Sequence, residues 1–303
     1  MKTKLAVLFI FFLLQLSCDN SIDYIGDFSQ QYSLNCVLRS DKNVQYATIK
    51  RSYPPESAAS QTDIQNAVVS LILPDTTLFF RDSILSGESS GNVGSFYYIN
   101  NFSLTKNTEV RIQAVLPDST VLTAQVKSAG YTRVLLESED LVLPGSEDES
   151  AFFMWRILGE QDSIILLPSL YIRYIISGPD TAVKYKKING TYIQNGNVFR
   201  VANSALSLGM SQISEGIADK SSITIIDGFF ELKLCDFMMG MYAAAAETFE
   251  DEFSVRISAA DFSNINGGLG IFGTYMSESF DILFLPEYVA SFGYNLAPPS
   301  ADK

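Results

Sequence analysis

The sequence predicts a mainly β protein of two domains, an N-terminal immunoglobulin-like or transthyretin-like β-sandwich followed by a second antiparallel β domain with one or two helices. Short segments of alternating apolar and polar residues recur along the chain, and in the first half no helical segment separates them. Strands that follow one another directly are typical of antiparallel sandwiches rather than βαβ units. An acidic segment interrupts the pattern near mid-chain, and an apolar content of 47% suffices for a core.

The first domain is expected over residues 29–136. Its alternation is clearest at Val110, Ile112 and Ala114, which occupy every second position as in a half-buried strand. A hairpin-type turn, Pro117-Asp118-Ser119, follows. Six strands are predicted in this domain, over residues 32–38, 45–51, 67–73, 94–99, 109–116 and 121–127.

Residues 137–150 are predicted to form an acidic interdomain linker. They contain six carboxylates, one proline and one glycine, which is typical of a solvated connection. Clustered carboxylates also suit Ca²⁺, although the regular acid spacing of a calcium loop is missing. The calcium site stays open as the alternative.

The second domain is expected over residues 151–296. A helix is predicted near 236–249, because Asp236 can cap it and four consecutive alanines favour it. Residues 203–218 are ambiguous and are a second candidate helix, and residues 297–303 are predicted to be a disordered tail. Strands are predicted over residues 152–158, 163–167, 170–177, 183–188, 197–202, 222–226, 229–234, 253–257 and 280–284.

The first residues of the chain predict export. Lys2 and Lys4 precede an apolar run of ten residues, which fits a signal peptide and is too short to span a bilayer. Ser17-Cys18 after this run looks like a bacterial lipoprotein processing site. Residues 1–17 are thus a predicted signal peptide, Cys18 is the predicted lipid attachment site, and residues 18–28 are the lipidated tether. The alternative is an ordinary secretory signal with an incidental cysteine.

The amino-acid composition excludes several classes of ligand and of catalytic mechanism. Loss of Lys2 and Lys4 with the signal peptide changes the net charge from −13 to −15, a poor surface for nucleic acid. The chain has no histidine, which removes serine–histidine and cysteine–histidine catalysis and histidine-ligated zinc. Cys36 and Cys235 lie in apolar segments; they are expected to be buried free thiols, with a disulfide in the oxidising envelope as the alternative.

A glycine-rich segment, Gly267 to Gly273, contains a G-x-G-x-x-G pattern. A dinucleotide-binding loop needs a strand directly before the glycines and a helix directly after them. Here nine residues separate the preceding predicted strand from the glycines, the following residues favour strand, and only 30 residues remain. We therefore expect no nucleotide and no other cofactor. The glycines are expected to shape the beginning of a strand by positive φ or close backbone approach.

The same residues carry a family resemblance. Residues 263–273, SNINGGLGIFG, resemble the C-terminal signature of a Bacteroidota envelope lipoprotein family catalogued as a domain of unknown function, with Gly267, Gly268, Gly270, Phe272 and Gly273 as the markers. In that family a region beginning Glu-Leu and carrying a tyrosine pair precedes the signature; here Glu231-Leu232 and a single Tyr242 correspond. Residues 66–71 and 94–98, with Trp155, Tyr171 and Tyr174, also fit the family. The resemblance implies no catalytic residues and an association with TonB-dependent nutrient transporters.

Five tripeptides match the pattern at which Bacteroidota O-glycosylate exported proteins, which is Asp followed by Ser or Thr and then a small or aliphatic residue or Thr. Such dipeptides are also ordinary turn residues. The candidate acceptors are Thr76, Ser83, Ser119, Ser163 and Thr181.

The sequence is compatible with three functions. The first is a non-enzymatic accessory or binding lipoprotein of the outer membrane, partnered with the membrane through its lipid and with a TonB-dependent transporter. The second is a structural or adhesive cell-surface module. The third is a hydrolase with two carboxylates about 5–10 Å apart in a cleft. No catalytic residue and no metal ligand is assigned from the sequence.

Overall fold

The computed structural model describes residues 29–52, 63–86, 93–139, 150–159, 164–178, 182–193, 197–217, 219–248 and 263–298. Several predicted features lie outside these residues: the signal peptide, Cys18 and the tether, most of the linker, Ser163, Thr181, the strand at 253–257 and the tail from residue 299.

The fold is mainly β, as predicted, and its central element is a nine-stranded sheet that we call the shared sheet. Its spatial order is β12 (Lys184–Ile188), β11 (Ile165–Ile176), β15 (Ile223–Cys235), β16 (Phe272–Ile282), β1 (Tyr32–Arg39), β2 (Gln45–Arg51), β6 (Val93–Ile99) and β5 (Arg81–Ser86), with β17 (Asn295–Leu296) paired to β15.

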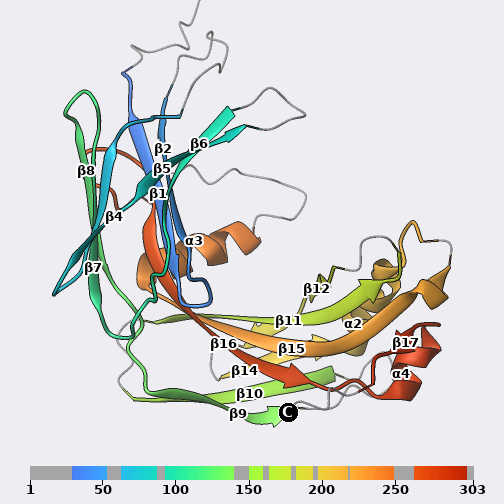
Figure 1. The fold of residues 1–303 in the computed structure, drawn as a ribbon. Coiled ribbons are helices and arrows are strands. Elements are labelled where there is room, and N and C mark those ends of the chain that lie inside the picture. Colours follow the sequence, from blue (N-terminus) through green and yellow to red (C-terminus); the bar gives the residue numbers. More distant parts are fainter. Residues whose placement is uncertain are drawn as a thin grey trace, which may run out of the picture.

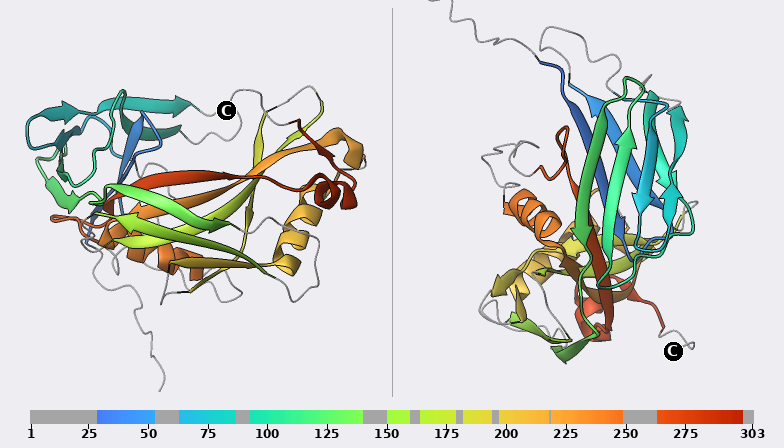
Figure 2. Two further views of the ribbon diagram at one scale, coloured as in Figure 1. Left: turned by 90° about the horizontal axis from the view of Figure 1, so that it is seen from below. Right: turned by 90° about the vertical axis from the view of Figure 1, so that its left-hand side faces the viewer.

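Two four-stranded sheets cover different parts of the shared sheet. The N-terminal cover sheet has the order β4 (Thr77–Phe79), β3 (Val68–Ile72), β7 (Glu109–Val115) and β8 (Val121–Lys127). The C-terminal cover sheet has the order β13 (Thr191–Ile193), β14 (Val198–Ala202), β10 (Ser150–Leu158) and β9 (Arg133–Glu139). The result is two sandwiches built on one sheet, standing at an angle to each other (Figure 1). Figure 2, right, looks onto the N-terminal cover sheet with the blue strands of the shared sheet behind it.

Three α-helices lie in the described residues: α2 (Asn203–Ile213), α3 (Phe237–Thr248) and α4 (Pro286–Ser291). A 3₁₀ turn, η1 (Lys220–Ser222), precedes β15. Helix α3 begins as predicted, because the Asp236 carboxylate accepts the backbone N–H groups of Met238 (2.9 Å) and Met239 (3.1 Å). This helix packs on β11, β15 and β16, in the angle between the sandwiches (Figure 1).

Strand β16 joins the two sandwiches. Its first residues pair in parallel with β1, from Cys36↔Phe272 to Arg39↔Tyr275. From Tyr275 onward it pairs antiparallel with β15, as far as Gly228↔Ile282. The C-terminal part of the chain therefore contributes hydrogen bonds to the N-terminal sandwich.

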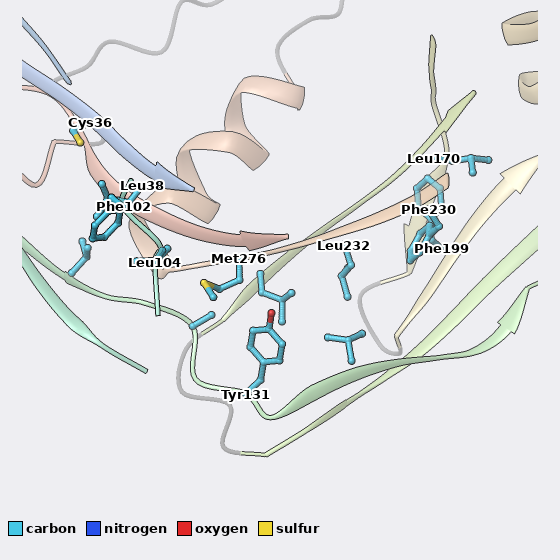
Figure 3. Close-up of a cluster of buried hydrophobic side chains, with 14 of the residues drawn as sticks. Cys36, Leu38, Phe102, Leu104, Tyr131, Leu170, Phe199, Phe230, Leu232 and Met276 are labelled. Carbon is cyan, nitrogen blue, oxygen red and sulfur yellow. The ribbon is translucent and has the colours of Figure 1, made fainter. Parts of the chain in front are cut away.

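One hydrophobic core runs through the junction. In the second sandwich Phe230 of the shared sheet stacks on Phe153 of the cover sheet, with ring centroids 5.2 Å apart, and contacts Trp155 at 5.6 Å. Leu104, Met276 and Tyr131 lie between this cluster and the Cys36–Leu38 side of the first sandwich (Figure 3). Cys36 and Cys235 are buried free thiols, and burial raises the pKa of Cys36 to about 12.

Several predicted boundaries were wrong. Strand β9 extends to Glu139 and β10 begins at Ser150, so both ends of the predicted linker are strand; the two strands pair antiparallel, with Phe153 opposite Glu139. Strand β11 continues through Pro168, where a break was predicted, and β15 continues through the break predicted after residue 226. The short strands β4, β5, β13 and β17, the strand β9 and the helix α4 were not predicted, and β16 begins at Phe272 instead of residue 280. Ala297, in the predicted disordered tail, donates its backbone N–H to Ile225 O at 2.7 Å.

Candidate functional site

The glycine-rich segment forms backbone hydrogen bonds with one strand of each sheet of the first sandwich, β1 and β8. Leu269 accepts the backbone N–H of Leu34 (2.9 Å) and donates its own to Tyr32 O (2.8 Å) on β1. Asn266 exchanges two backbone hydrogen bonds with Thr123 of β8, at 2.7 and 3.1 Å. Residues 263–273, which we call the glycine clasp, therefore connect the shared sheet to the N-terminal cover sheet.

Two glycines of the clasp have backbone conformations that other residues rarely adopt. Gly267 has φ of 84° and Gly270 has φ of 113°. A Cβ atom on Gly270 would lie 2.1 Å from the carbonyl oxygen of Leu34. A Cβ on Gly268 would likewise meet Tyr32 O at 2.5 Å, and one on Gly273 would meet the Met239 Cβ at 2.8 Å. The segment can lie this close to β1, β8 and α3 only without side chains at these positions.

Several polar backbone groups of the clasp are used within the protein. Asn264 accepts the N–H of Phe272 (2.9 Å) and donates to its carbonyl oxygen (2.7 Å). The Ile271 N–H is donated to the Asn35 side chain at 3.2 Å. The Phe272 side chain is 0% exposed. These groups hold a strand in place, whereas a phosphate-binding loop directs its N–H groups at a ligand.

The described glycosylation candidates lie in two kinds of site. Thr76 is exposed in the turn between β3 and β4, and Ser119 is exposed in the turn between β7 and β8 with φ of 71°. Ser83 is half-buried in β5, opposite Phe96 of β6.

Tyr32 stands between two hollows, of about 400 and 270 Å³, at the tip of the first sandwich. Its hydroxyl donates to the Asp118 carboxylate at 2.5 Å. This hydrogen bond raises the pKa of Tyr32 and lowers that of Asp118. A third hollow, of about 340 Å³, lies between the end of β8 and the start of α3 and is lined by Lys127, Asp236 and Phe237 among others.

The sequence did not predict a cluster on the uncovered face of the shared sheet. Leu170 and Ile172 point into the second sandwich and are fully buried, so Tyr171 and Arg173 between them point to the opposite face. This face lies on the side of α3 (Figure 1). We call the group of Tyr171, Arg173, Tyr185, Asp227, Phe229 and Asp281 the outer-face cluster.

The aromatic rings of the cluster come from three adjacent strands. Tyr171 of β11 and Phe229 of β15 are paired across the sheet and stack, with centroids 4.9 Å apart and planes 11° apart. Tyr185 of edge strand β12 meets Phe229 edge-on, at 6.0 Å and 86°. Tyr185 remains 59% exposed. The contact with Phe229 thus orients an aromatic ring that stays accessible to solvent.

Arg173 joins the aromatic rings to two carboxylates. Its guanidinium pairs with both oxygens of Asp227 (2.5 Å each) and with Asp281 at 2.8 Å, and its Cζ lies 5.3 Å from the Phe229 ring centroid. The hydrogen bond to Asp227 raises the Arg173 pKa further. The two carboxylates are neighbours, but both are bound to one guanidinium as ion pairs. A glycosidase instead needs one carboxyl group kept protonated as an acid.

Within the described ranges no group of three or more Cys, Asp or Glu is arranged to hold a metal ion. Most of the segment 137–150, where calcium was the alternative, lies outside those ranges. The helices of the described chain are too short or too polar to cross a membrane.

Comparison with known proteins assigns the chain to no family and gives it no function. No family model matches the chain, and no curated protein matches it. The family resemblance of residues 263–273 therefore stays a prediction from the sequence.

Proposed function

We propose that this chain is a lipid-anchored, non-enzymatic accessory or binding component of the bacterial outer membrane, partnered with a TonB-dependent nutrient transporter. The proposed location rests on the predicted signal peptide that ends directly before Cys18 and on the family resemblance of residues 263–273. The observation that carries the binding role is the outer-face cluster, because exposed aromatic residues beside an arginine are enriched where proteins bind partners.

The arrangement of the molecule supports this proposal. The described chain starts at the tip of the first sandwich, and the strands of the cluster belong to the second sandwich (Figure 1). A lipid on Cys18 would hold the protein by that tip. The cluster would then lie in the second sandwich, beyond the first one from the point of attachment, on the face of the shared sheet that looks toward α3.

The anchor is tested in a Bacteroidota host with the tagged full chain and its Cys18→Ser variant. Wild-type protein should sediment with the outer membrane, and its intact mass should include the acyl chains, since a stable anchor requires at least two. Cys18→Ser should lose both properties, whereas Asn20→Ser, which keeps the cysteine, should retain them. Unlipidated soluble wild-type protein would refute the anchor.

The partner is tested by cross-linking in intact cells before detergent extraction. Recovery of a TonB-dependent transporter with wild-type protein supports the accessory role. Recovery of other surface proteins instead would favour the structural or adhesive alternative. No cross-linked partner would contradict the transporter proposal.

A further inference from the structure

We propose that the outer-face cluster binds an uncharged oligosaccharide, with the Tyr185 ring as its stacking surface. This inference rests on the proposed binding function and specifies the ligand class. Three observations carry it: the orientation of the Tyr185 ring, the hydrogen-bonding groups beside it and the charge balance of the cluster.

The Tyr185 ring is both accessible and oriented. It is 59% exposed, and its edge-on contact with Phe229 is backed by the stack of Phe229 on Tyr171. A tyrosine loses little conformational entropy on binding, because only two side-chain torsions are fixed. The apolar C–H face of a sugar ring can pack on such an aromatic face, where its loss of contact with water is favourable.

The polar groups beside the ring match hydroxyl groups. A carboxylate has about four lone-pair sites, so the two bonds that Asp227 accepts from Arg173 leave acceptor capacity. The guanidinium presents five N–H donors in a fixed plane. A sugar hydroxyl both donates and accepts, so neighbouring hydroxyls can use the carboxylate and the guanidinium together.

The charge of the cluster favours a neutral ligand. Arg173 is offset by Asp227 and Asp281, and Lys187 stands opposite Tyr171 in the sheet. These two cations and two carboxylates balance, so the attraction of a charged ligand to one pair is offset by its repulsion from the other. An uncharged ligand with many hydroxyls meets no such repulsion.

The test uses the mature chain from residue 18 carrying Cys18→Ser, so that it is soluble. It is screened against neutral oligomers of glucose, galactose, mannose and xylose, and against sulfated and uronic-acid oligomers as anionic counterparts. Affinity for the best neutral oligomer is then measured by titration calorimetry. We expect Tyr185→Ala to weaken binding by about tenfold or more and Tyr185→Phe to retain it. Tyr46→Ala is the matched control, because Tyr46 is 54% exposed on the uncovered face of the same sheet but in the first sandwich.

The inference is overturned if no neutral oligomer binds, if only anionic oligomers bind, or if Tyr185→Ala binds as well as the Tyr46→Ala control. If Tyr185→Ala instead abolishes recovery of a cross-linked protein partner and no sugar binds, the cluster is a protein-docking surface. Sugar binding by a protein that is found outside the outer membrane would defeat the proposed function and leave this inference standing.

Discussion

At the scale of single residues, Gly270 explains the most specific motif of the sequence. A residue with a side chain would have to adopt positive φ there, and its Cβ would overlap the Leu34 carbonyl oxygen. That oxygen belongs to the backbone of β1, so it cannot move away unless the strand moves. Both penalties act in the folded state, and unfavourable φ alone costs about 1–3 kcal/mol. The G-x-G-x-x-G pattern thus serves close backbone approach in a sheet edge.

Gly270→Ala should therefore lower the free energy of unfolding by more than about 2 kcal/mol. Gly178→Ala is the control, because a Cβ there meets nothing within 4 Å, and it should change stability by less than about 0.5 kcal/mol. Urea denaturation followed by circular dichroism measures both. Equal stability of the two variants would refute the clasp.

Asp236 is a buried carboxylate that joins α3 to β16. One oxygen caps the helix, and the other accepts the backbone N–H and the hydroxyl of Thr274. Burial raises its pKa, although these hydrogen bonds act in the opposite direction. A raised pKa in the folded state means that the native protein binds this proton more tightly than the unfolded chain does.

The stability contributed by this proton is fully present below the unfolded-state pKa and is lost as the pH rises through the folded-state pKa. Asp236→Ser removes the titration and retains a capping oxygen. The stability difference between wild type and Asp236→Ser should thus favour wild type more at pH 3.5 than at pH 7. Denaturant titrations at both pH values test this, and a difference that grows with pH would contradict it.

The glycosylation candidates differ in accessibility. Thr76 and Ser119 lie in exposed turns, whereas Ser83 lies half-buried in β5. If the protein is O-glycosylated in its native host, glycopeptide mass spectrometry should find the glycan on Thr76 and Ser119, with Ser83 unmodified. Thr76→Ala and Ser119→Ala should each remove one glycan mass from the intact protein. Unmodified peptides at both turns would exclude the modification there.

At the scale of elements, a small polar cluster holds the two sandwiches together. The Tyr131 hydroxyl, from the connection between β8 and β9, donates to Glu278 of β16 at 2.6 Å. Lys106 pairs with the same carboxylate at 3.4 Å, and its ammonium group lies 3.7 Å from the centroid of the Tyr131 ring. Burial and the Glu278 carboxylate raise the pKa of Tyr131, so it remains a hydrogen-bond donor.

Tyr131→Phe should cost about 1.5–3 kcal/mol, the range for a hydrogen bond to a charged group. Tyr46→Phe, at an exposed site, should cost less than about 0.5 kcal/mol. In a double-mutant cycle with Glu278→Gln, the two changes should be coupled by at least about 0.5 kcal/mol. Additive effects would show that the hydroxyl and the carboxylate act independently.

The elements also show what sequence patterns can and cannot predict. The six strands predicted in the first half exist because their alternation matches a half-buried sheet. Pro168 suggested a break. Among the described strands, however, β12 pairs only with residues from Leu170 onward, so β11 is paired on one side alone at Pro168 and tolerates a residue without an N–H group. The break predicted in β15 after residue 226 is instead a β-bulge, in which Ile226 is the extra residue opposite Arg173 and the strand continues.

The outer-face cluster was beyond sequence reasoning for a related reason. Alternation within β11 and β15 separates inward from outward residues, but it does not reveal that Tyr171, Phe229 and Tyr185 are neighbours. Their proximity depends on the register between β11 and its two neighbours, and β15 lies more than 40 residues further along the chain, so long-range pairing determines that part of it.

At the scale of the whole molecule, the shared sheet makes the two sandwiches interdependent. Strand β16 hydrogen-bonds to β1 of the first and to β15 of the second, and the core continues between them. Neither sandwich can lose β16 without exposing an edge of its own sheet. Unfolding should therefore be a single cooperative transition, although the predicted division places two domains in this chain.

Trp155 makes this testable, because it is the single tryptophan and lies 1% exposed in the second sandwich. Gly270→Ala disturbs the contact with β1 and β8 of the first sandwich. If the molecule unfolds as one unit, this variant should lower the urea midpoint of Trp155 fluorescence as much as that of circular dichroism. Gly178→Ala should move neither midpoint. The contradicting result is a lowered circular dichroism midpoint with an unchanged fluorescence midpoint. It would show that the second sandwich remains folded after the first has unfolded. The hydrogen bonds of β16 would then be too weak to couple the two sandwiches.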